Sequence, residues 1–347
     1  MTPTVARDPL SARDARSGAD HDRAQSRPVT GSSAYIARVN RVLDHIDGHL
    51  PDELDLRALA RVARLSPWHF HRVFQALTGE TVADRVRRRR LEVAAARLLA
   101  SDDKALRIAL DVGFGSAEVF TRCFRAYFGV TPTAWRRGGF RAWASRHRVA
   151  LSKIRQADRK TYQEVVQAFL QDGELWPAGH VPRRRKGDVM EVKLQTIPKT
   201  RVAYLRHVGP YGGSGIAQAW QRFAAWCEEH GLMSPRRRMY GVCQDIPDLT
   251  PPEKCRYDAC VEVDASFRPE GEFGVQTLPG GLHACTKFTG TPDRIHAAWM
   301  ALYAGWLPDS GYQADDRPCV ERYIRDPSLD RRDGAFSCWL CLPVRVV

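Results

Sequence analysis

The chain has 347 residues, of which 44% are hydrophobic, so it is long enough and apolar enough for two folded domains and is not a wholly disordered protein. Its formal net charge is +13, yet residues 191–347 hold 19 basic and 19 acidic side chains, so the whole excess precedes them. A basic first part predicts contact with a polyanion. The alternative is a set of solvated, arginine-rich helices.

No stretch approaches the roughly 20 apolar residues of a membrane span, and no apolar N-terminal segment suits a signal peptide, so a cytoplasmic protein without a membrane partner is expected. Nine cysteines, an odd number, favour reduced thiols over a disulfide scaffold. Cys338 and Cys341 form a CxxC pair, but the surrounding run is typical of a strand, and no second pair completes a zinc site. We therefore expect structural cysteines, no metal and no cofactor.

Residues 1–30 lack hydrophobic periodicity and predict a disordered tail. A helical pattern starts at Tyr35 and ends before Pro51. A nine-residue pattern with serine, phenylalanine, arginine and phenylalanine at fixed spacing then occurs twice, at 66–74 and 116–124. A short predicted helix precedes each copy, so the pattern indicates two helix-turn-helix units.

Ser66 and Ser116 stand where a helix N-cap is expected, because a serine hydroxyl accepts an unpaired backbone N–H there. Apolar residues at i, i+3, i+4 and i+7 predict the buried face of each repeat helix. These residues are Phe70, Val73, Phe74 and Leu77 in the first copy and Phe120, Cys123, Phe124 and Tyr127 in the second.

The opposite face of each repeat helix is expected to meet base edges in the major groove. The candidate DNA contacts are Trp68, His69, His71, Arg72 and Gln75 in the first copy and Glu118, Thr121 and Arg122 in the second. Arg72 and Arg122 can each make the bidentate contact to guanine, which contributes roughly 1–3 kcal/mol of discrimination. Glu118 and Val119 make the second copy the weaker reader, so an asymmetric DNA site is expected.

A long helix is predicted over 82–99, between the two copies, and it carries clustered arginines at 85 and 87–90. We expect this cluster, with Arg88 as its representative, to hold backbone phosphates. The alternative for each of these arginines is a solvated or ion-paired side chain.

Residues 50–137 resemble the DNA-binding domain of the AraC/XylS family. The resemblance rests on LRALARVARLSPWHFHRVFQALTGET at 56–81 and RIALDVGFGSAEVFTRCFRAYFGVTPTAWRR at 107–137. It implies an all-α domain over 31–140, in which two helix-turn-helix units joined by a long helix enter successive major-groove segments. Double-stranded DNA is the implied partner, and RNA polymerase is a further candidate.

Residues 141–189 are basic and are predicted to form a partly helical connector. From 190 to 347 the residue pattern changes to short runs with the alternation typical of strands, at 192–197, 202–208, 257–263, 283–288, 319–324 and 336–344. Helices are predicted at 215–229 and 292–305, and similar residues recur about 80 positions apart, such as Trp220 and Trp299. The prediction is an α+β domain of two β-α-β-β repeats on an antiparallel sheet.

This second part resembles GyrI-like, multidrug-regulator-type effector-binding domains, through HVGPYGGSGIAQAWQRFAAW at 207–226, RYDACVEVD at 256–264 and PCVERYIRDP at 318–327. The resemblance implies a cleft between the two repeats with one glutamate, Glu321, at its base. The candidate wall residues are Tyr211, Trp220, Trp299, Tyr303 and Tyr323. A desolvated carboxylate is costly, and a cationic ligand held by aromatic rings offsets that cost.

Together these features predict a one-component transcription regulator that senses a small hydrophobic or cationic molecule, with no catalytic residues. The alternatives are a GyrI-like hydrolase, in which Glu321 acts with Tyr303, and a ligand-sequestering protein tethered to DNA. The operator, the effector and the sign of regulation stay open.

Overall fold

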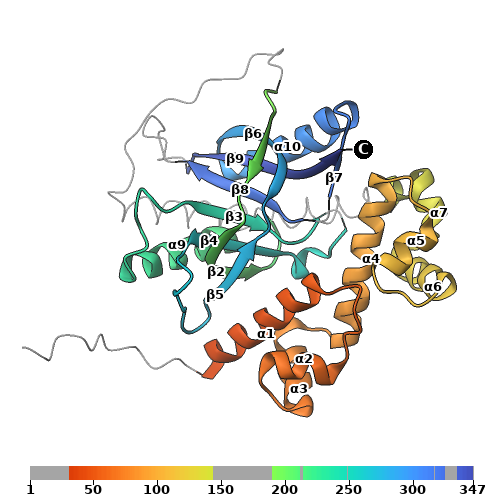
Figure 1. Cartoon of the computed structure of the whole chain (residues 1–347), viewed down its shortest axis with the longest axis horizontal. Helices are drawn as coiled ribbons and strands as arrows, with labels where there is room; N and C mark the ends of the chain where they lie inside the picture. The colour runs from red at the N-terminus through yellow and green to blue at the C-terminus, as the bar shows by residue number, and fades with distance from the viewer. Residues whose placement is uncertain are drawn as a thin grey trace, which may run out of the picture.

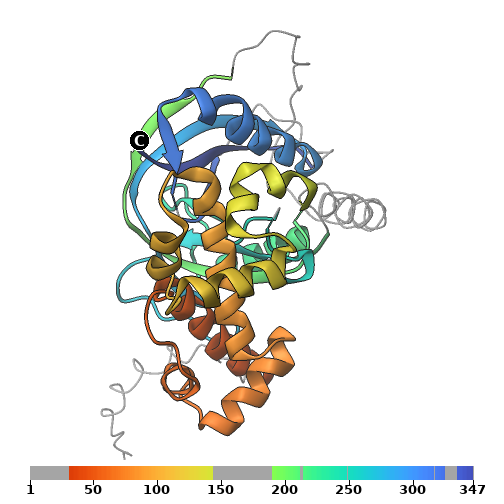
Figure 2. The same cartoon turned by 90° about the vertical axis from the view of Figure 1, so that its right-hand side faces the viewer.

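The computed structural model describes residues 31–143, 190–211, 214–247, 249–315, 317–324 and 334–346. The predicted tail and nearly all of the predicted connector lie outside these residues. A helical part lies beside a strongly curved sheet, and the view turned by 90° places the helices in front of the sheet (Figures 1 and 2). Within the described ranges, no helix combines the length and apolar character needed to cross a membrane.

The helical part contains two helix-turn-helix units on either side of one long helix. Its elements are α1 (Gly31–Gly48), α2 (Leu56–Ala63), α3 (Pro67–Thr78), α4 (Val82–Ala100), α5 (Ala105–Asp111), α6 (Ala117–Phe128) and α7 (Pro132–Ala134), followed by a π-helical turn, Trp135–Gly139. The pairs α2–α3 and α5–α6 correspond to the two sequence repeats. The predicted all-α arrangement of two such units joined by a long helix is confirmed.

Each unit has its own core, and α4 contributes to both. Phe70 and Phe74 are fully buried in the first core, and Phe120 and Phe124 are almost fully buried in the second. The prediction for Leu77 is wrong, because this side chain is 45% exposed beyond the edge of the first core. Trp143 packs on Phe128 and Trp135, so the second core continues beyond residue 140.

The two predicted N-cap serines differ in their hydrogen bonds. The Ser116 hydroxyl accepts the Val119 N–H at 3.3 Å, whereas Ser66 occupies the N-cap position of α3 without a side-chain cap hydrogen bond. The second turn requires Gly113, whose φ is +92° and where a Cβ would lie 2.5 Å from the Leu50 carbonyl oxygen.

The second part consists of an antiparallel sheet with two helices and shorter helical turns. Its strands are β1 (Lys193–Ile197), β2 (Thr200–Val208), β3 (Met239–Cys243), β4 (Arg256–Glu262), β5 (Gly274–Leu278), β6 (Gly281–Gly290), β7 (Tyr312–Ala314), β8 (Cys319–Ile324) and β9 (Phe336–Val346). Its helices are α9 (Ser214–Glu229) and α10 (Pro292–Met300), and the latter continues as the π-helical turn Ala301–Trp306. The shorter 3-10 turns are Pro252–Lys254 and Leu307–Asp309.

The strand order β1-β6-β9-β8-β3-β4-β2-β5 reads as two equivalent halves that meet at β3 and β8. The predicted two-repeat antiparallel domain is therefore confirmed, and the structure adds β3, β5 and the short β7 to the six strands that the sequence pattern indicated. The first strand of each repeat pairs with a strand of the other repeat: β1 pairs with β6, and β5 pairs with β2. Helix α9 packs on β2 and β4, and α10 packs on β6.

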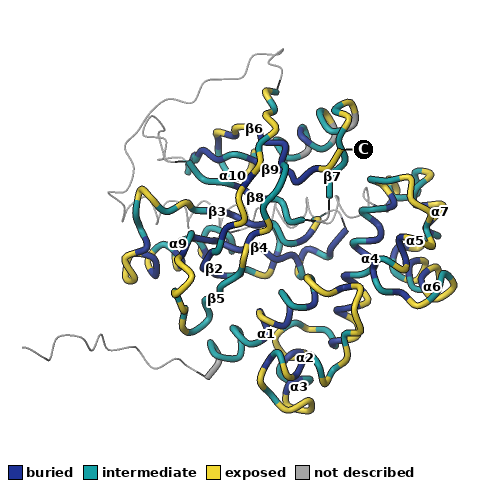
Figure 3. Tube along the Cα trace, in the orientation of Figure 1, coloured by how far each residue is buried: buried dark blue, intermediate teal, exposed yellow. Residues whose placement is uncertain are grey.

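The two parts are in contact, since α1 lies against β5 and the side chain of Lys254 donates to the Thr78 carbonyl oxygen at 3.1 Å. The central strands and much of α4 have the colour of buried residues in Figure 3. Burial of α4 is unexpected for a helix that is so rich in arginine, and it decides whether those arginines face solvent or form ion pairs.

Candidate DNA-binding and ligand-binding sites

Helix α3 presents an exposed polar and aromatic face. Trp68 is 71% exposed, and the Arg72 guanidinium lies 4.8 Å from the centroid of its ring, in a cation–π arrangement. Gln75 is exposed, and His71 is half-buried. His69 is exposed and lies against Tyr35 of α1, with 5.4 Å between ring centroids. The first set of candidate contacts therefore forms one accessible surface.

Helix α6 presents a smaller set. Glu118, Thr121 and Arg122 are exposed and line a shallow surface depression, and Val119 is 39% exposed beside them. Backbone and Ser116 hydrogen bonds at the helix N-terminus lower the pKa of Glu118, so the carboxylate stays charged. A fixed negative charge disfavours phosphate and favours a cytosine amino group.

The expectation for Arg88 needs correction. Its side chain is 5% exposed, and its guanidinium donates to the carboxylates of Glu80 at 2.8 Å and Glu92 at 2.9 Å. Burial alone lowers the pKa of Arg88, but these two carboxylates raise it above its ordinary value. Of the five clustered arginines at 85 and 87–90, only Arg87 is exposed. Arg88 is thus an internal ion-pairing residue, because α4 is covered on both sides.

Arg88 belongs to a larger group of charges between the two parts of the chain, which we term the interdomain ion-pair cluster. From the helical part it contains Asp44, Asp47, Glu80, Arg85, Arg88, Arg89 and Glu92, and from the sheet part Arg206, Asp245, Lys254, Arg256 and Asp258.

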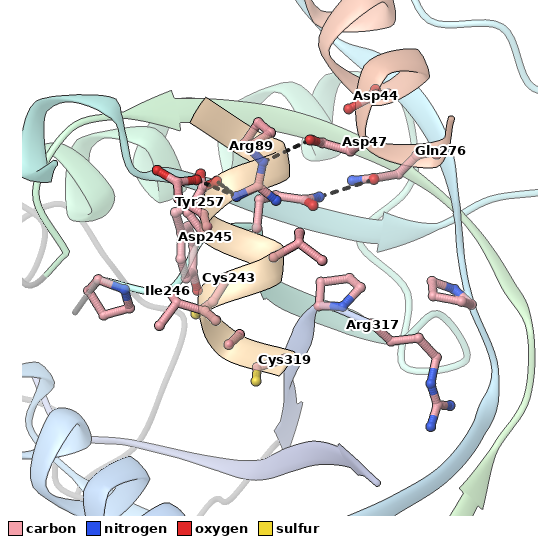
Figure 4. A pocket seen from close by; sticks show the side chains of 18 of the residues that line it. Asp44, Asp47, Arg89, Cys243, Asp245, Ile246, Tyr257, Gln276, Arg317 and Cys319 are labelled. Carbon is pink, nitrogen blue, oxygen red and sulfur yellow. Dashed lines mark hydrogen bonds and ion pairs between the residues drawn. The ribbon is translucent and has the colours of Figure 1, made fainter. Parts of the chain in front are cut away.

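Arg89 and Asp47 lie at the centre of this cluster. Arg89 pairs with Asp47 at 2.9 Å within its own domain and with Asp245 at 2.9 Å across the interface (Figure 4). Asp47 in turn accepts from Arg256 at 2.5 Å across the same interface. Burial alone raises the pKa of Asp47, but Arg256, Arg89 and Arg85 together hold it well below its usual range. Buried charges in this arrangement require both domains to be in place.

A second part of the cluster joins α1 to β2. Arg206 pairs with Asp44 at 2.8 Å and with Asp258 at 2.7 Å, and the Tyr204 hydroxyl donates to Asp44 at 2.7 Å. Burial raises the pKa of Asp44 despite the nearby Arg206. Asp44 therefore gains a proton more readily than a surface aspartate.

Glu321 lies on β8, opposite Gly241 of β3, and is 4% exposed. Its carboxylate accepts from the hydroxyls of Tyr257 at 2.8 Å and Tyr323 at 3.0 Å. The Trp299 indole N–H donates at 3.5 Å. Burial raises the pKa of Glu321, and these donors offset part of that rise. Gly241 leaves the space for this group, because a Cβ there would overlap the Tyr257 hydroxyl.

A cavity of about 1660 Å³ opens at the end of the sheet where β3 ends and β4 and β8 begin. Of the predicted ligand residues, Glu321, Tyr211, Trp299 and Tyr303 line it. Trp220 and Tyr323 are not among the lining residues. Their polar atoms instead meet the Tyr257 hydroxyl, at 3.2 Å and 3.0 Å, so they support the wall from behind.

Sequence reasoning missed Tyr257 as the centre of this hydrogen-bonded group. It lies within the quoted stretch at 256–264, but only the register of β3 and β4, which pairs Cys243 with Tyr257, brings it to the face of Glu321. The Tyr303 hydroxyl lies 2.9 Å from the Cys319 sulfur. All nine cysteines are free thiols, and the described residues contain no cluster of three or more residues suited to a metal ion.

Both parts of the chain are similar to known protein domains. The sequence model of a helix-turn-helix domain matches residues 59–138, and that of the GyrI-like small molecule binding domain matches residues 190–345. The chain belongs to the AraC/XylS family of transcriptional regulators. This AraC/XylS-family regulator carries a GyrI-like domain as its second part.

Relatives match one or the other part of the regulator. The regulatory protein SoxS of Escherichia coli K12 is 35% identical over 26% of the chain and 85% of its own length. A DNA gyrase inhibitor of Edwardsiella piscicida is 32% identical over 45% of the chain and 99% of its own length. A further match is the solved C-terminal domain of AraT, a response regulator from Geobacillus stearothermophilus. It is 28% identical over 29% of the chain and 84% of its own length, with a TM-score of 0.28. The AraC-type helix-turn-helix domain binds DNA, and the GyrI-like domain is a small molecule binding domain.

Proposed function

We propose that this AraC/XylS-family regulator is a one-component transcription factor, in which residues 31–140 bind a promoter and residues 190–347 sense a small molecule. One observation carries the proposal. A single chain combines two exposed recognition helices with a large cavity that contains a buried carboxylate, Glu321. RNA polymerase is the further partner if the protein activates transcription.

The promoter site is asymmetric, because the two recognition helices are unequal. The exposed face of α3 carries Trp68, Arg72 and Gln75, all able to meet DNA. The exposed face of α6 carries a charged Glu118 and an apolar Val119, which leaves Arg122 as its best reader of guanine.

Selection of binding sites from random DNA tests this arrangement. Arg72→Ala and Arg122→Ala are each expected to relax specificity at a different base pair and to weaken binding by roughly 1–3 kcal/mol. The exposed Arg107 on α5 serves as a control, because it lies outside both recognition helices. Equal loss of affinity for all sequences in both variants would argue against base readout by these arginines.

The effector is a lipophilic cation. The cavity is lined by eight carboxylates, four arginines and two histidines, in a chain whose net charge is +13. The carboxylates are Asp44, Asp47, Glu92, Asp111, Asp245, Asp293, Asp315 and Glu321, and the arginines are Arg41, Arg89, Arg97 and Arg317. Aromatic rings of Tyr211, Trp299 and Tyr303 add faces suited to a delocalised cation.

Two probes of equal shape and opposite charge test this assignment. Isothermal titration calorimetry is expected to show tetraphenylphosphonium binding at least about tenfold more tightly than tetraphenylborate. Glu321→Gln keeps the shape of the site and is expected to reduce that preference. Tighter binding of the anion would refute a cationic effector.

Ligand sensing without turnover agrees best with the surroundings of Glu321. Its carboxylate is committed to Tyr257, Tyr323 and Trp299, and the Tyr303 hydroxyl, its predicted catalytic partner, contacts Cys319. The hydrolase alternative predicts a product when an ester or epoxide probe is incubated with the protein. The sequestration alternative predicts binding of tetraphenylphosphonium without any change in DNA affinity.

A further inference from the structure

The cavity has two walls that come from different domains. Its lining includes Asp44, His45 and Asp47 of α1 and Glu92, Val93 and Ala96 of α4, in addition to the residues of the GyrI-like domain. We propose that the effector binds both domains at once, with the AraC-type domain supplying one wall of the ligand site. This inference rests on the proposed sensing of a lipophilic cation.

Carboxylates line both walls of the cavity. Four of the eight lining carboxylates, Asp44, Asp47, Glu92 and Asp111, belong to the AraC-type domain. The other four belong to the GyrI-like domain. Each of the first four is ion-paired with an arginine, so a cation reaches these carboxylates by competing with that arginine.

The apolar part of the shared wall lies on α4. Val93 and Ala96 are half-buried, line the cavity and pack at the edge of the helical cores. Because α4 joins the two helix-turn-helix units, a ligand against these side chains touches the element that sets the spacing of the recognition helices.

The same cavity contains the groups that hold the domains together. Asp47, Arg89 and Asp245 line it, and Figure 4 shows Arg89 pairing with both carboxylates. A cation there competes with Arg89 for these carboxylates. Ligand binding and domain docking are therefore coupled. Where docking changes the affinity for DNA, DNA binding changes the affinity for the ligand by the same factor.

The test places a bulky side chain on the wall that belongs to the AraC-type domain. In the full chain, Ala96→Phe is expected to lower the affinity for tetraphenylphosphonium about tenfold, measured by calorimetry. Ala83→Phe is the matched control, because Ala83 is exposed on the same helix and does not line the cavity; its affinity is expected to stay within about twofold of wild type. If Ala96→Phe fails to fold by circular dichroism, the smaller Ala96→Leu replaces it, with the same direction of change.

The outcomes separate the two proposals. Unchanged affinity in Ala96→Phe and Ala96→Leu, together with weaker binding in Glu321→Gln, overturns the shared wall and leaves the sensing function intact. Equal losses in Ala96→Phe and Ala83→Phe also overturn it. No binding of tetraphenylphosphonium by the wild-type chain overturns the proposed effector class and this inference with it.

Discussion

Arg88 gives the sharpest test of how the arginines of α4 are used. In wild type, its guanidinium donates to Glu80 at 2.8 and 3.1 Å and to Glu92 at 2.9 Å, and all three side chains are at most 9% exposed. Arg88→Met retains much of the apolar volume but removes the positive charge. Loss of one partner of a buried ion pair costs about 3–5 kcal/mol, since the remaining charge stays desolvated.

The remaining partners set the size of the effect. Glu92 keeps Arg89 at 2.8 Å, and Glu80 keeps Arg85 and Lys254 at 3.7 Å each. We therefore expect the lower end of the range, about 3 kcal/mol, in the free energy of unfolding measured with urea. The control is Arg87→Met on the same helix: its pair with Asp84 is about half exposed, so the loss is below about 1 kcal/mol.

DNA binding supplies the second measurement. Removing one side chain that neutralises a phosphate of duplex DNA lowers the slope of log affinity against log salt concentration by about 0.9. Since Arg88 is buried and paired, Arg88→Met is expected to leave that slope unchanged for the folded protein. A slope smaller by about one with wild-type stability would refute the reasoning and assign Arg88 to a phosphate.

Three further predictions concern two glycines and one carboxylate. Gly113→Ala is expected to lower the free energy of unfolding by about 1–3 kcal/mol, because φ is +92° and a Cβ would lie 2.5 Å from a carbonyl oxygen; Gly115→Ala, with open space around it, is the control in the same urea experiment. Gly241→Ala is expected to abolish tetraphenylphosphonium binding in calorimetry, because its Cβ would displace the tyrosine hydroxyl that holds Glu321, and wild-type affinity would contradict this role. Burial raises the pKa of Glu321, so its carboxyl group binds a proton more tightly in the folded protein than in the unfolded chain. The contribution of Glu321 to stability therefore falls as the pH rises from 4.5 through the raised pKa. Cation affinity is expected to rise over the same pH window and to change less in Glu321→Gln; identical pH profiles would show that Glu321 does not contribute.

The sequence alone determined the features that depend on neighbours along the chain. Periodic phenylalanines predicted α3 and α6 and their buried faces, and the recurrence of Trp220 and Trp299 indicated two related halves in the sheet domain. Short, little-alternating strands such as β3 and β5 carry weak local signals and were missed. Leu77 satisfied the helical period but lies beyond the edge of its core.

Only the tertiary structure decided which charged groups face water and which face each other. The arginines of α4 have the composition of a DNA-binding surface, and no local pattern distinguishes them from one. Docking of the GyrI-like domain brings Asp245 and Arg256 to α1 and α4 from more than a hundred residues away. Burial then turns Arg88 and Arg89 into ion-pairing residues, because a desolvated charge requires an opposite charge beside it. The same docking adds residues of α1 and α4 to the lining of the cavity that contains Glu321, which the GyrI-like domain alone does not supply.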